Sequence, residues 1–388
     1  MFSTRLPFSL VPTPLAAAVA ARRQRPGRLV DLTICNPTRA GLAYPETLAT
    51  AYSNAAVLQY DPEPRGLPAA RQAIAQWHGS IGESMTPDQL VLTASTSEAY
   101  SLLFKLLCDP GDRVLVPCPS YPLFEHLAHL DGVVVDRYTF RDVGRWILDE
   151  AHLHASVTSR TRALIVVAPN NPTGHVPTPQ EWDTIGDVCR RHGLALIVDE
   201  VFSAYPLSAT STHVQTPQMP GVLTFRLNGL SKLVGLPQAK LGWILVTGPD
   251  NRRRAALDAL DVIADTYLSV STAVQVALPT LLEVGASVRR QILDRVRSNL
   301  AYVAGRVAGS TIDVRMPDGG WSVVLRVPCT GGPDDLALAL LGRDVVVHPG
   351  YFYDLPHDGF VVISLLACEA DVRDGLDALC ALPLLQLT

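Results

Sequence analysis

From about residue 88 to residue 250 the chain alternates short apolar runs with longer helical patterns, and this alternation restricts the fold more than any other feature. Five runs have the composition of buried strands: 113–119, 163–169, 194–199, 222–225 and 243–246. Helical patterns separate them, the clearest from Pro179 to His192, with Gly193 as a stop signal. Such alternation is typical of a mostly parallel sheet flanked by helices. The sequence therefore predicts an α/β fold.

After residue 250 the pattern changes, and a chain of 388 residues is long enough for a second core. The later segments comprise helical patterns at 252–264, 272–282 and 288–307, short strands at 320–326 and 360–364, and a last helix at 369–382. We predict three parts: an N-terminal segment 1–45 that packs on the lobes, a large domain 46–255, and a smaller α/β C-terminal domain 256–388.

Polar motifs follow three of the predicted strands. They are Asn170-Asn171, Asp199-Glu200 and the turn from Asn228 to Lys232. In open parallel sheets, ligands bind beyond the carboxyl ends of the strands. The motifs therefore predict one binding site at that edge of the sheet.

Lysine is rare in this chain, which has only Lys105, Lys232 and Lys240 among its 32 basic Lys and Arg residues. An arginine stays charged, whereas a lysine amine can lose its proton and attack a carbonyl carbon. Lys105 lies in an apolar helical stretch, where we expect its stem to cover the core edge. Lys232, in the polar turn, is the candidate nucleophile.

Composition excludes several classes of function. The net charge is −5 and no basic stripe is present, so nucleic acid is not expected as a partner. No run approaches the roughly 20 apolar residues that span a bilayer. Seven cysteines without a C-x-x-C motif indicate free thiols in a reducing, cytoplasmic compartment. The histidine pairs have no adjacent cysteine or carboxylate set, so no metal site is predicted.

In their order and spacing, these motifs resemble those of the pyridoxal-phosphate-dependent aminotransferases of class I/II, the aspartate aminotransferase superfamily of fold type I. The resemblance runs from about residue 30 to the C-terminus. It implies a pyridoxal 5'-phosphate cofactor bound in the large domain, and an amino donor and keto acceptor that react in turn, in a ping-pong reaction. Such enzymes need a lysine for the cofactor's aldehyde, a carboxylate at its pyridine nitrogen and a phosphate cradle.

The resemblance implies a role for each motif. Ser231-Lys232 matches the family's Ser-Lys, so Lys232 is the expected Schiff-base lysine and proton shuttle. Asp199 matches the aspartate at the pyridine nitrogen, and Asn171 matches the donor to the cofactor's phenolic oxygen. Tyr121, in Pro-Ser-Tyr-Pro, matches the aromatic residue that stacks on the cofactor ring.

The phosphate end is expected at Ser95 and Thr96, which precede an apolar helix. A helix N-terminus offers free N–H groups and a favourable dipole to a phosphate. Tyr60 matches a tyrosine that reaches the phosphate of the neighbouring subunit's site. The resemblance therefore implies a homodimer with shared active sites.

Several positions depart from the family pattern around the phosphate and the ring. Lys240 stands where an arginine is usual, so a bidentate fork is lost. Gly229 replaces a frequent serine, and Ser95 replaces a frequent glycine. Phe202 replaces a tyrosine that donates to the phenolic oxygen.

The largest departure is Val362, where the family usually has an arginine that grips the substrate's α-carboxylate. Three explanations are open. The substrate lacks an α-carboxylate, or Arg39 in Asn36-Pro-Thr-Arg39 replaces the missing arginine, or the alignment of this segment is shifted.

Two other functions remain as alternatives to amino transfer. The same scaffold serves lyases, cyclases and decarboxylases, and the missing arginine favours them. A non-catalytic cofactor-binding protein is the third hypothesis, against which Lys232, Asp199 and Asn171 all argue.

Phe202 generates a prediction about pH. Because a donor to an oxyanion is lost, the ionised form is disfavoured. We expect the Lys232 Schiff base to keep its proton to a higher pH in the wild type than in Phe202→Tyr, measured by spectral titration. Equal midpoints in the two proteins would contradict this role of Phe202.

Overall fold

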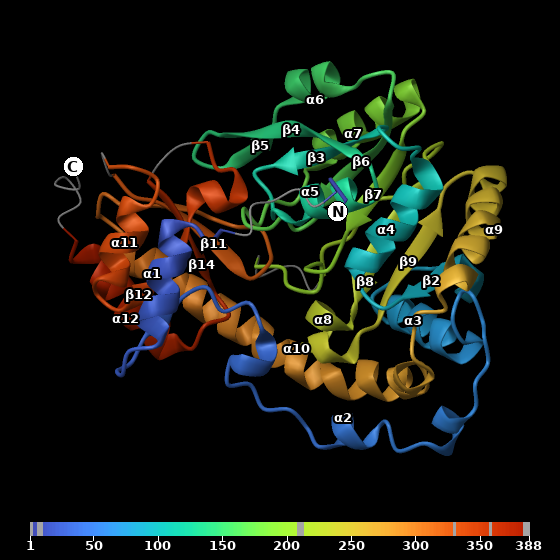
Figure 1. The fold of residues 1–388 in the computed structure, drawn as a ribbon, viewed down its shortest axis with the longest axis horizontal. Coiled ribbons are helices and arrows are strands. Elements are labelled where there is room, and N and C mark those ends of the chain that lie inside the picture. Colours follow the sequence, from blue (N-terminus) through green and yellow to red (C-terminus); the bar gives the residue numbers. More distant parts are fainter. Residues whose placement is uncertain (1–2, 6–10, 208–212, 329–330, 357–358, 383–388) are drawn as a thin grey trace.

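The computed structural model describes residues 3–5, 11–207, 213–328, 331–356 and 359–382. Figure 1 shows a large sheet with its helices beside a smaller C-terminal part, and the long helix α10 (Thr272–Val307) runs along both. This two-part α/β arrangement agrees with the fold class predicted from the sequence.

The large sheet has eight strands in the order β2-β9-β8-β7-β6-β3-β4-β5. Neighbouring strands from β8 to β4 are all parallel, while β2, β9 and β5 pair antiparallel with their neighbours. The predicted mostly parallel sheet is therefore confirmed. The strands are β2 Leu90–Thr93, β3 Arg113–Cys118, β4 Val134–Asp142, β5 Trp146–Leu148, β6 Thr161–Val167, β7 Ala195–Asp199, β8 Thr224–Gly229 and β9 Gly242–Thr247.

Both faces of this sheet are buried. In β6, Ala163 and Ile165 join the core under α4, α5 and α9, whereas Leu164 and Val166 join the core under α6 and α7. Side chains that alternate across a strand explain why the whole run must be apolar. The helices are α3 Pro68–Ser80, α4 Thr96–Leu107, α5 Leu123–Leu130, α6 Glu150–Ser156, α7 Pro179–His192 and α9 Asp250–Tyr267.

Helix α7 has both ends that the sequence signals predict. Thr178 and Glu181 form a capping box at its start, with Pro179 in the first turn. Gly193 follows its end with φ of 65°, a left-handed conformation that glycine adopts without a Cβ clash.

The smaller part contains a four-stranded antiparallel sheet in the order β10-β11-β14-β13. The N-terminal segment packs on this part, because β1 (Val30–Asp31) pairs in parallel with β12 (Val345–Val346). The elements of the N-terminal segment and the smaller part are α1 Pro14–Arg23, β10 Asp313–Arg315, β11 Ser322–Arg326, α11 Asp335–Leu341, β13 His348–Pro349, β14 Phe360–Ser364 and α12 Glu369–Cys380.

Short helical turns connect these elements. Among them, α2 (Thr47–Thr50) and η2 (Ala55–Leu58) lie against α10. The remaining turns are η1 Pro37–Arg39, η3 Pro87–Gln89, α8 Leu230–Leu233, η4 Pro237–Ala239 and η5 Gly350–Tyr353.

The prediction of separate helices at 272–282 and 288–307 was wrong, because the structure has one helix of 36 residues, α10. Gly285 is a close-packing position, since a Cβ there would lie 2.6 Å from the Cβ of Val234. A glycine required by packing gives the same sequence signal as a helix break. Helix α9 spans the predicted boundary at residue 255, so the three-part division stays a prediction.

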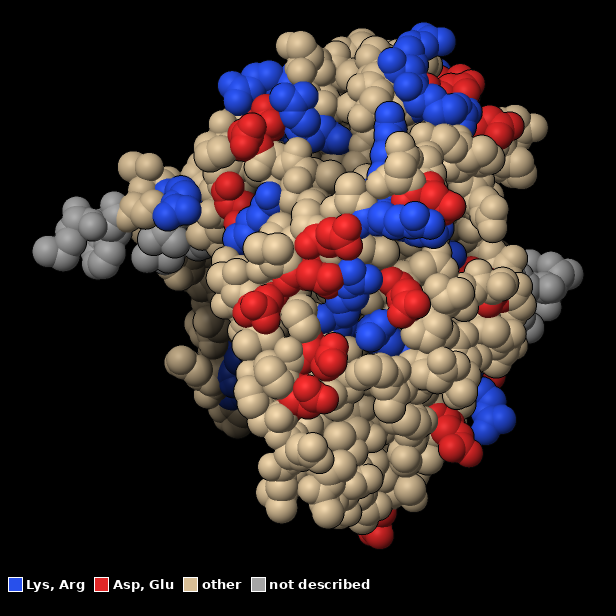
Figure 2. All heavy atoms as spheres, turned by 90° about the vertical axis from the view of Figure 1, so that its right-hand side faces the viewer, with Lys and Arg blue, Asp and Glu red and all other residues tan. Residues whose placement is uncertain are grey.

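The surface around α9 carries mixed charge. Figure 2 shows this side of the molecule, where basic side chains lie beside acidic ones. Arg65 forms an ion pair with Asp261 of α9 at 2.5 Å, and Arg253 pairs with Asp250 at 2.9 Å. No helix in the described part of the chain combines the length and apolar character needed to cross a membrane.

Candidate active site

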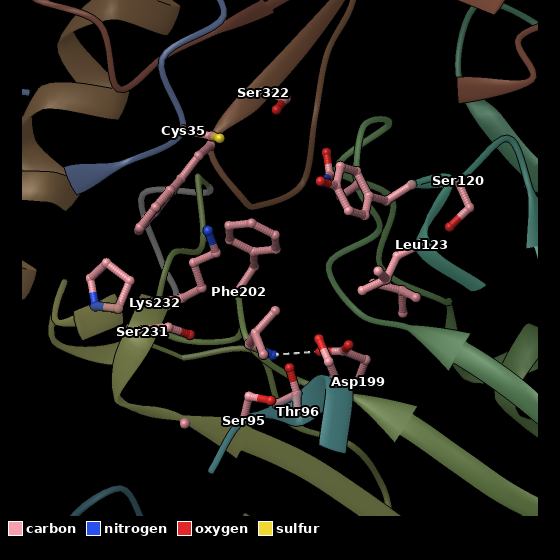
Figure 3. A pocket seen from close by; sticks show the side chains of 18 of the residues that line it. Cys35, Ser95, Thr96, Ser120, Leu123, Asp199, Phe202, Ser231, Lys232 and Ser322 are labelled. Carbon is pink, nitrogen blue, oxygen red and sulfur yellow. Dashed lines mark hydrogen bonds between the residues drawn. The ribbon is translucent and has the colours of Figure 1, made fainter. Parts of the chain in front are cut away.

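A cavity of about 490 Å³ lies at the carboxyl ends of β6, β7 and β8. Asn171, Asp199 and Lys232 line it from the large part, and Trp321 and Val362 line it from the smaller part. Figure 3 shows the labelled side chains turned into this space, with Cys35 and Ser322 on the opposite side of Lys232 from Ser95 and Thr96. The polar motifs that follow the strands are therefore brought together as predicted.

Lys232 lies in α8, the single helical turn that follows β8. Its amine is 5.0 Å from the ring centroid of Trp321 and 5.7 Å from that of Phe202. Burial lowers the pKa of Lys232, although Cys35 and Asp199 oppose this shift. A buried amine of lowered pKa is more available as a nucleophile than a solvated one.

Asp199 is the last residue of β7 and lies deep in the cavity. Its carboxylate accepts hydrogen bonds from the Tyr100 hydroxyl and the Val201 N–H, each at 3.1 Å. Burial raises the pKa of Asp199 to about 6, and these two hydrogen bonds oppose the shift. Tyr100 was not singled out in the sequence, where it is one more apolar position of a buried helix.

The N-terminus of α4 opens on the same cavity. Ser95 is its N-cap and accepts a hydrogen bond from the Glu98 N–H at 3.1 Å, and Thr96 is its first residue. Ser231 and Lys240 line the cavity with them. Lys240 has a left-handed backbone with φ of 54°, which is costly for a residue with a side chain.

Two glycines set the width of this end of the cavity. Gly229 of β8 pairs with Gly242 of β9. A Cβ on Gly229 would lie 2.9 Å from the Gly242 Cα, and a Cβ on Gly242 would lie 3.2 Å from the Ser95 carbonyl carbon. The missing side chain of Gly229 lets β8 and β9 lie close together, and the missing side chain of Gly242 lets β9 approach the turn before α4.

Aromatic rings form the remaining walls. Tyr121, which is 43% exposed, lies 6.3 Å from Tyr353 between ring centroids. Tyr353 lies 5.3 Å from Phe352, and Phe352 stacks on His348 at 5.0 Å. On the Lys232 side, Phe202 and Trp321 meet edge to face at 5.3 Å.

Sequence reasoning found Tyr121 and Phe202 but missed Trp321, His348 and Tyr353. The run of aromatic residues at 351–353 was the available signal. It does not indicate which ring reaches the cavity, because that depends on how the two parts of the molecule meet.

Three predicted site residues do not line the cavity of this chain. Asn36 caps η1, accepting a hydrogen bond from the Thr38 N–H at 3.1 Å. Arg39 is exposed at the end of η1. Tyr60 is 70% exposed and lines a separate depression beside Tyr267. Their roles in substrate or phosphate binding stay predictions.

The family model for aminotransferase class I and II matches residues 36–379. The chain belongs to this family. It is 29% identical over 268 residues to the glutamate-pyruvate aminotransferase AlaA of Haemophilus influenzae, covering 69% of this chain and 66% of that protein. It is also 29% identical over 268 residues to an alanine aminotransferase of Mycobacterium tuberculosis, covering 68% of this chain and 62% of that protein. The chain thus aligns with slightly less than two thirds of the length of these relatives.

Solved structures show the same fold. An aminotransferase from Escherichia coli superposes with a TM-score of 0.86 at 22% identity, covering 98% of this chain and 97% of that chain. Alanine aminotransferase from Pyrococcus furiosus gives 0.86 at 24% identity, covering 97% of this chain and 98% of that one.

Members of this family use pyridoxal phosphate, and the cavity fits that group. It holds a buried amine and a buried carboxylate, Lys232 and Asp199. It also holds the open N-terminus of a 12-residue helix beside a second lysine, Lys240. Lys232 can react with an aldehyde, and Asp199 can pair with a ring N–H. The N-terminus of α4 and Lys240 can bind a phosphate.

Gly229 generates a prediction at the phosphate end. Gly229→Ser restores the residue that many relatives have, yet its Cβ would meet backbone atoms of β9. We expect loss of stability by about 1–3 kcal/mol and weaker cofactor binding, measured by chemical unfolding and by cofactor titration. Gly305→Ser is the matched control, because a Cβ at Gly305 meets nothing within 4 Å. Tighter cofactor binding in Gly229→Ser would refute the packing argument.

Proposed function

We propose that this protein is a pyridoxal-phosphate-dependent aminotransferase that moves an amino group from an amine or amino acid to a keto acceptor. The observation that carries the proposal is the buried Lys232 amine in one cavity with the Asp199 carboxylate and the N-terminus of α4. The curated relatives named above are aminotransferases, which supports the same reaction class.

Lys232 has two tasks in this proposal. Its neutral amine holds the cofactor's carbonyl carbon, and burial favours that neutral form. Once freed by the substrate's amine, the same Nζ would accept the proton from the substrate carbon that bears the amine and would return it to the carbon that was the cofactor's carbonyl carbon. The bound cofactor supplies the electron sink that makes this carbon acidic.

The other residues bind and orient. Asp199 holds a proton at the ring nitrogen, and its position is set by hydrogen bonds from Tyr100 and Val201. Tyr121, Asn171 and Phe202 line the same cavity, where Tyr121 would cover the ring and the other two would contact its oxygen edge. The phosphate is assigned to four residues at the start of α4 and beyond β8: Ser95, Thr96, Ser231 and Lys240.

We also propose that the active unit is a homodimer. Tyr60 is 70% exposed on a segment outside its own cavity, as expected for a side chain that serves a partner's phosphate site. We further propose a cytoplasmic location. It is supported by the cysteines that the structure describes, all of which are free thiols: Cys35, Cys108, Cys118, Cys189, Cys368 and Cys380.

The first test of amino transfer uses lysine variants. Lys232→Ala should lower the rate of keto-product formation by about a hundredfold to ten-thousandfold, because both the nucleophile and the proton shuttle are lost. Lys105→Ala is the matched control, since this partly exposed lysine pairs with Asp131 on the surface. Release of ammonia or carbon dioxide without a transferred amino group would instead identify a lyase or decarboxylase.

The shared site predicts complementation. Tyr60→Ala and Lys232→Ala should each be impaired alone. In a mixed dimer, one site has both residues intact, so co-expression should restore activity per Tyr60→Ala subunit. We would measure amino transfer across mixing ratios. Activity that stays equal to the average of the two separate variants would refute a Tyr60 contribution in trans.

A further inference from the structure

We propose that the substrate of this cavity is a hydrophobic primary amine without an α-carboxylate, together with the corresponding aldehyde or ketone. This inference rests on the proposed amino transfer and names its substrate class. Five observations support it: the charges of the cavity, the assignment of its two lysines, the residues of the wall beyond Lys232, the hydrogen bonds of Ser364, and the aromatic rings at the mouth.

The cavity has few charges. Among its lining residues in the described part of the chain, the lysines and carboxylates are Lys232, Lys240 and Asp199, and none is an arginine. His348 also lines it, but burial lowers its pKa, which favours the neutral ring. A substrate carboxylate would therefore need Lys232 or Lys240 as its counter-charge.

Both lysines have other tasks. Lys232 must be neutral and reactive at the cofactor's carbonyl carbon. Lys240 comes two residues before Gly242, and the backbone of Gly242 lies close to Ser95 at the start of α4. We therefore assign the charge of Lys240 to the phosphate. The bound cofactor adds a phosphate to the negative charge of Asp199. A further carboxylate would be desolvated without a partner, which is costly.

The wall beyond Lys232 is apolar where it meets the substrate. Val362 is 1% exposed and sits in the middle of the small sheet, opposite Val324 of β11 and His348 of β13. Trp321 is 3% exposed and its ring lies beside the Lys232 amine. Both side chains line the cavity and carry no charge.

Two polar groups of this wall differ in their hydrogen bonds: the Trp321 indole N–H has no hydrogen-bond partner among the residues that the structure describes, whereas the Ser364 hydroxyl is occupied. The Ser364 hydroxyl donates to the Ile34 carbonyl oxygen at 2.5 Å and accepts from the Leu366 N–H at 3.1 Å. The hydrogen bond to Ile34 joins β14 to the N-terminal segment, and the hydrogen bond from Leu366 is local. Because the Ser364 hydroxyl already donates its hydrogen to Ile34, it cannot donate to a substrate carboxylate.

The mouth of the cavity is aromatic and partly exposed. Phe352 is 41% exposed, and Tyr121, which is assigned above to the cofactor ring, is 43% exposed here. Together with Tyr353 and His348 they form a chain of rings in contact. Exposed apolar side chains gathered at a cavity indicate a binding surface for an apolar group. The body of the substrate is therefore hydrophobic.

Binding of two unreactive probes tests this class directly. The protein, loaded with pyridoxal phosphate, is titrated by calorimetry with 3-phenylpropan-1-ol and with 3-phenylpropanoate, which differ in the carboxylate. We expect the neutral alcohol to bind at least about tenfold more tightly. Propan-1-ol should bind more weakly than its phenyl derivative, because it cannot cover the aromatic wall. Equal or tighter binding of the carboxylate would overturn the proposal, as would binding of neither phenyl probe.

Added positive charge should change this preference. Val362→Arg places a guanidinium on the wall, and Ser322→Arg places one at a half-buried position of the same wall if the buried site does not tolerate the change. Either variant should lower the ratio of alcohol to carboxylate affinity by about tenfold. Val262→Arg is the matched control, because Val262 is 70% exposed on α9. An unchanged ratio in folded Ser322→Arg and Val362→Arg would count against this wall as the substrate surface.

Amino transfer is then measured separately with phenylalaninol and phenylalanine. The proposal expects keto or aldehyde product from phenylalaninol in preference to phenylalanine. Preference for phenylalanine that is lost in Arg39→Ala would overturn it and assign the carboxylate to Arg39. Failure of both amines to transfer their amino group, with the probe preference intact, would refute the aminotransferase assignment and leave the neutral, hydrophobic character of the cavity standing.

Discussion

The parallel pairing of β7 with β8 is the constraint on which the site depends. In this register Asp199 lies opposite Leu227, so the chain that leaves β8 reaches Lys232 within one turn of the same sheet edge. Two ionisable groups are thereby buried in one cavity. Burial raises the pKa of Asp199 and lowers the pKa of Lys232. Burying either charge costs free energy unless a partner compensates it.

A buried cluster of ion pairs connects the ends of β7 and β8. Arg226 of β8 donates to Glu200 at 2.7 Å and to Glu83 at 2.7 Å, and His78 contacts Glu83 at 2.8 Å. Although burial opposes it, the hydrogen bond from His78 and the guanidinium of Arg226 lower the pKa of Glu83 to about 2. Because Glu200 follows Asp199 directly, this cluster ties the carboxylate's strand to β8 and to the residues after α3. Removing one member would leave buried charge without a partner.

The smaller part and the N-terminal segment complete the cavity. Strand β1 pairs with β12, and the Ser364 hydroxyl bonds to the Ile34 carbonyl. These contacts bring Cys35 to the side of Lys232 away from the start of α4, as Figure 3 shows, and Val362 and Trp321 line the same cavity. The large part therefore supplies the groups that fit the cofactor, while the smaller part supplies the neutral, aromatic surface that we assign to the substrate.

The sequence by itself determined five of the eight strands of the large sheet, helix α7 and the polar motifs at the strand ends, but it did not predict β2, β4 and β5. Periodicity, caps and Gly193 are local signals, and parallel strands place Asn171, Asp199 and Lys232 at one edge whatever the rest of the chain does. The tertiary structure alone decided that α10 is continuous and that Tyr100 donates to Asp199. It also decided that Trp321, His348 and Tyr353 form a wall with Tyr121. These contacts join residues far apart in the chain, so their formation depends on packing between elements, and no local pattern encodes it.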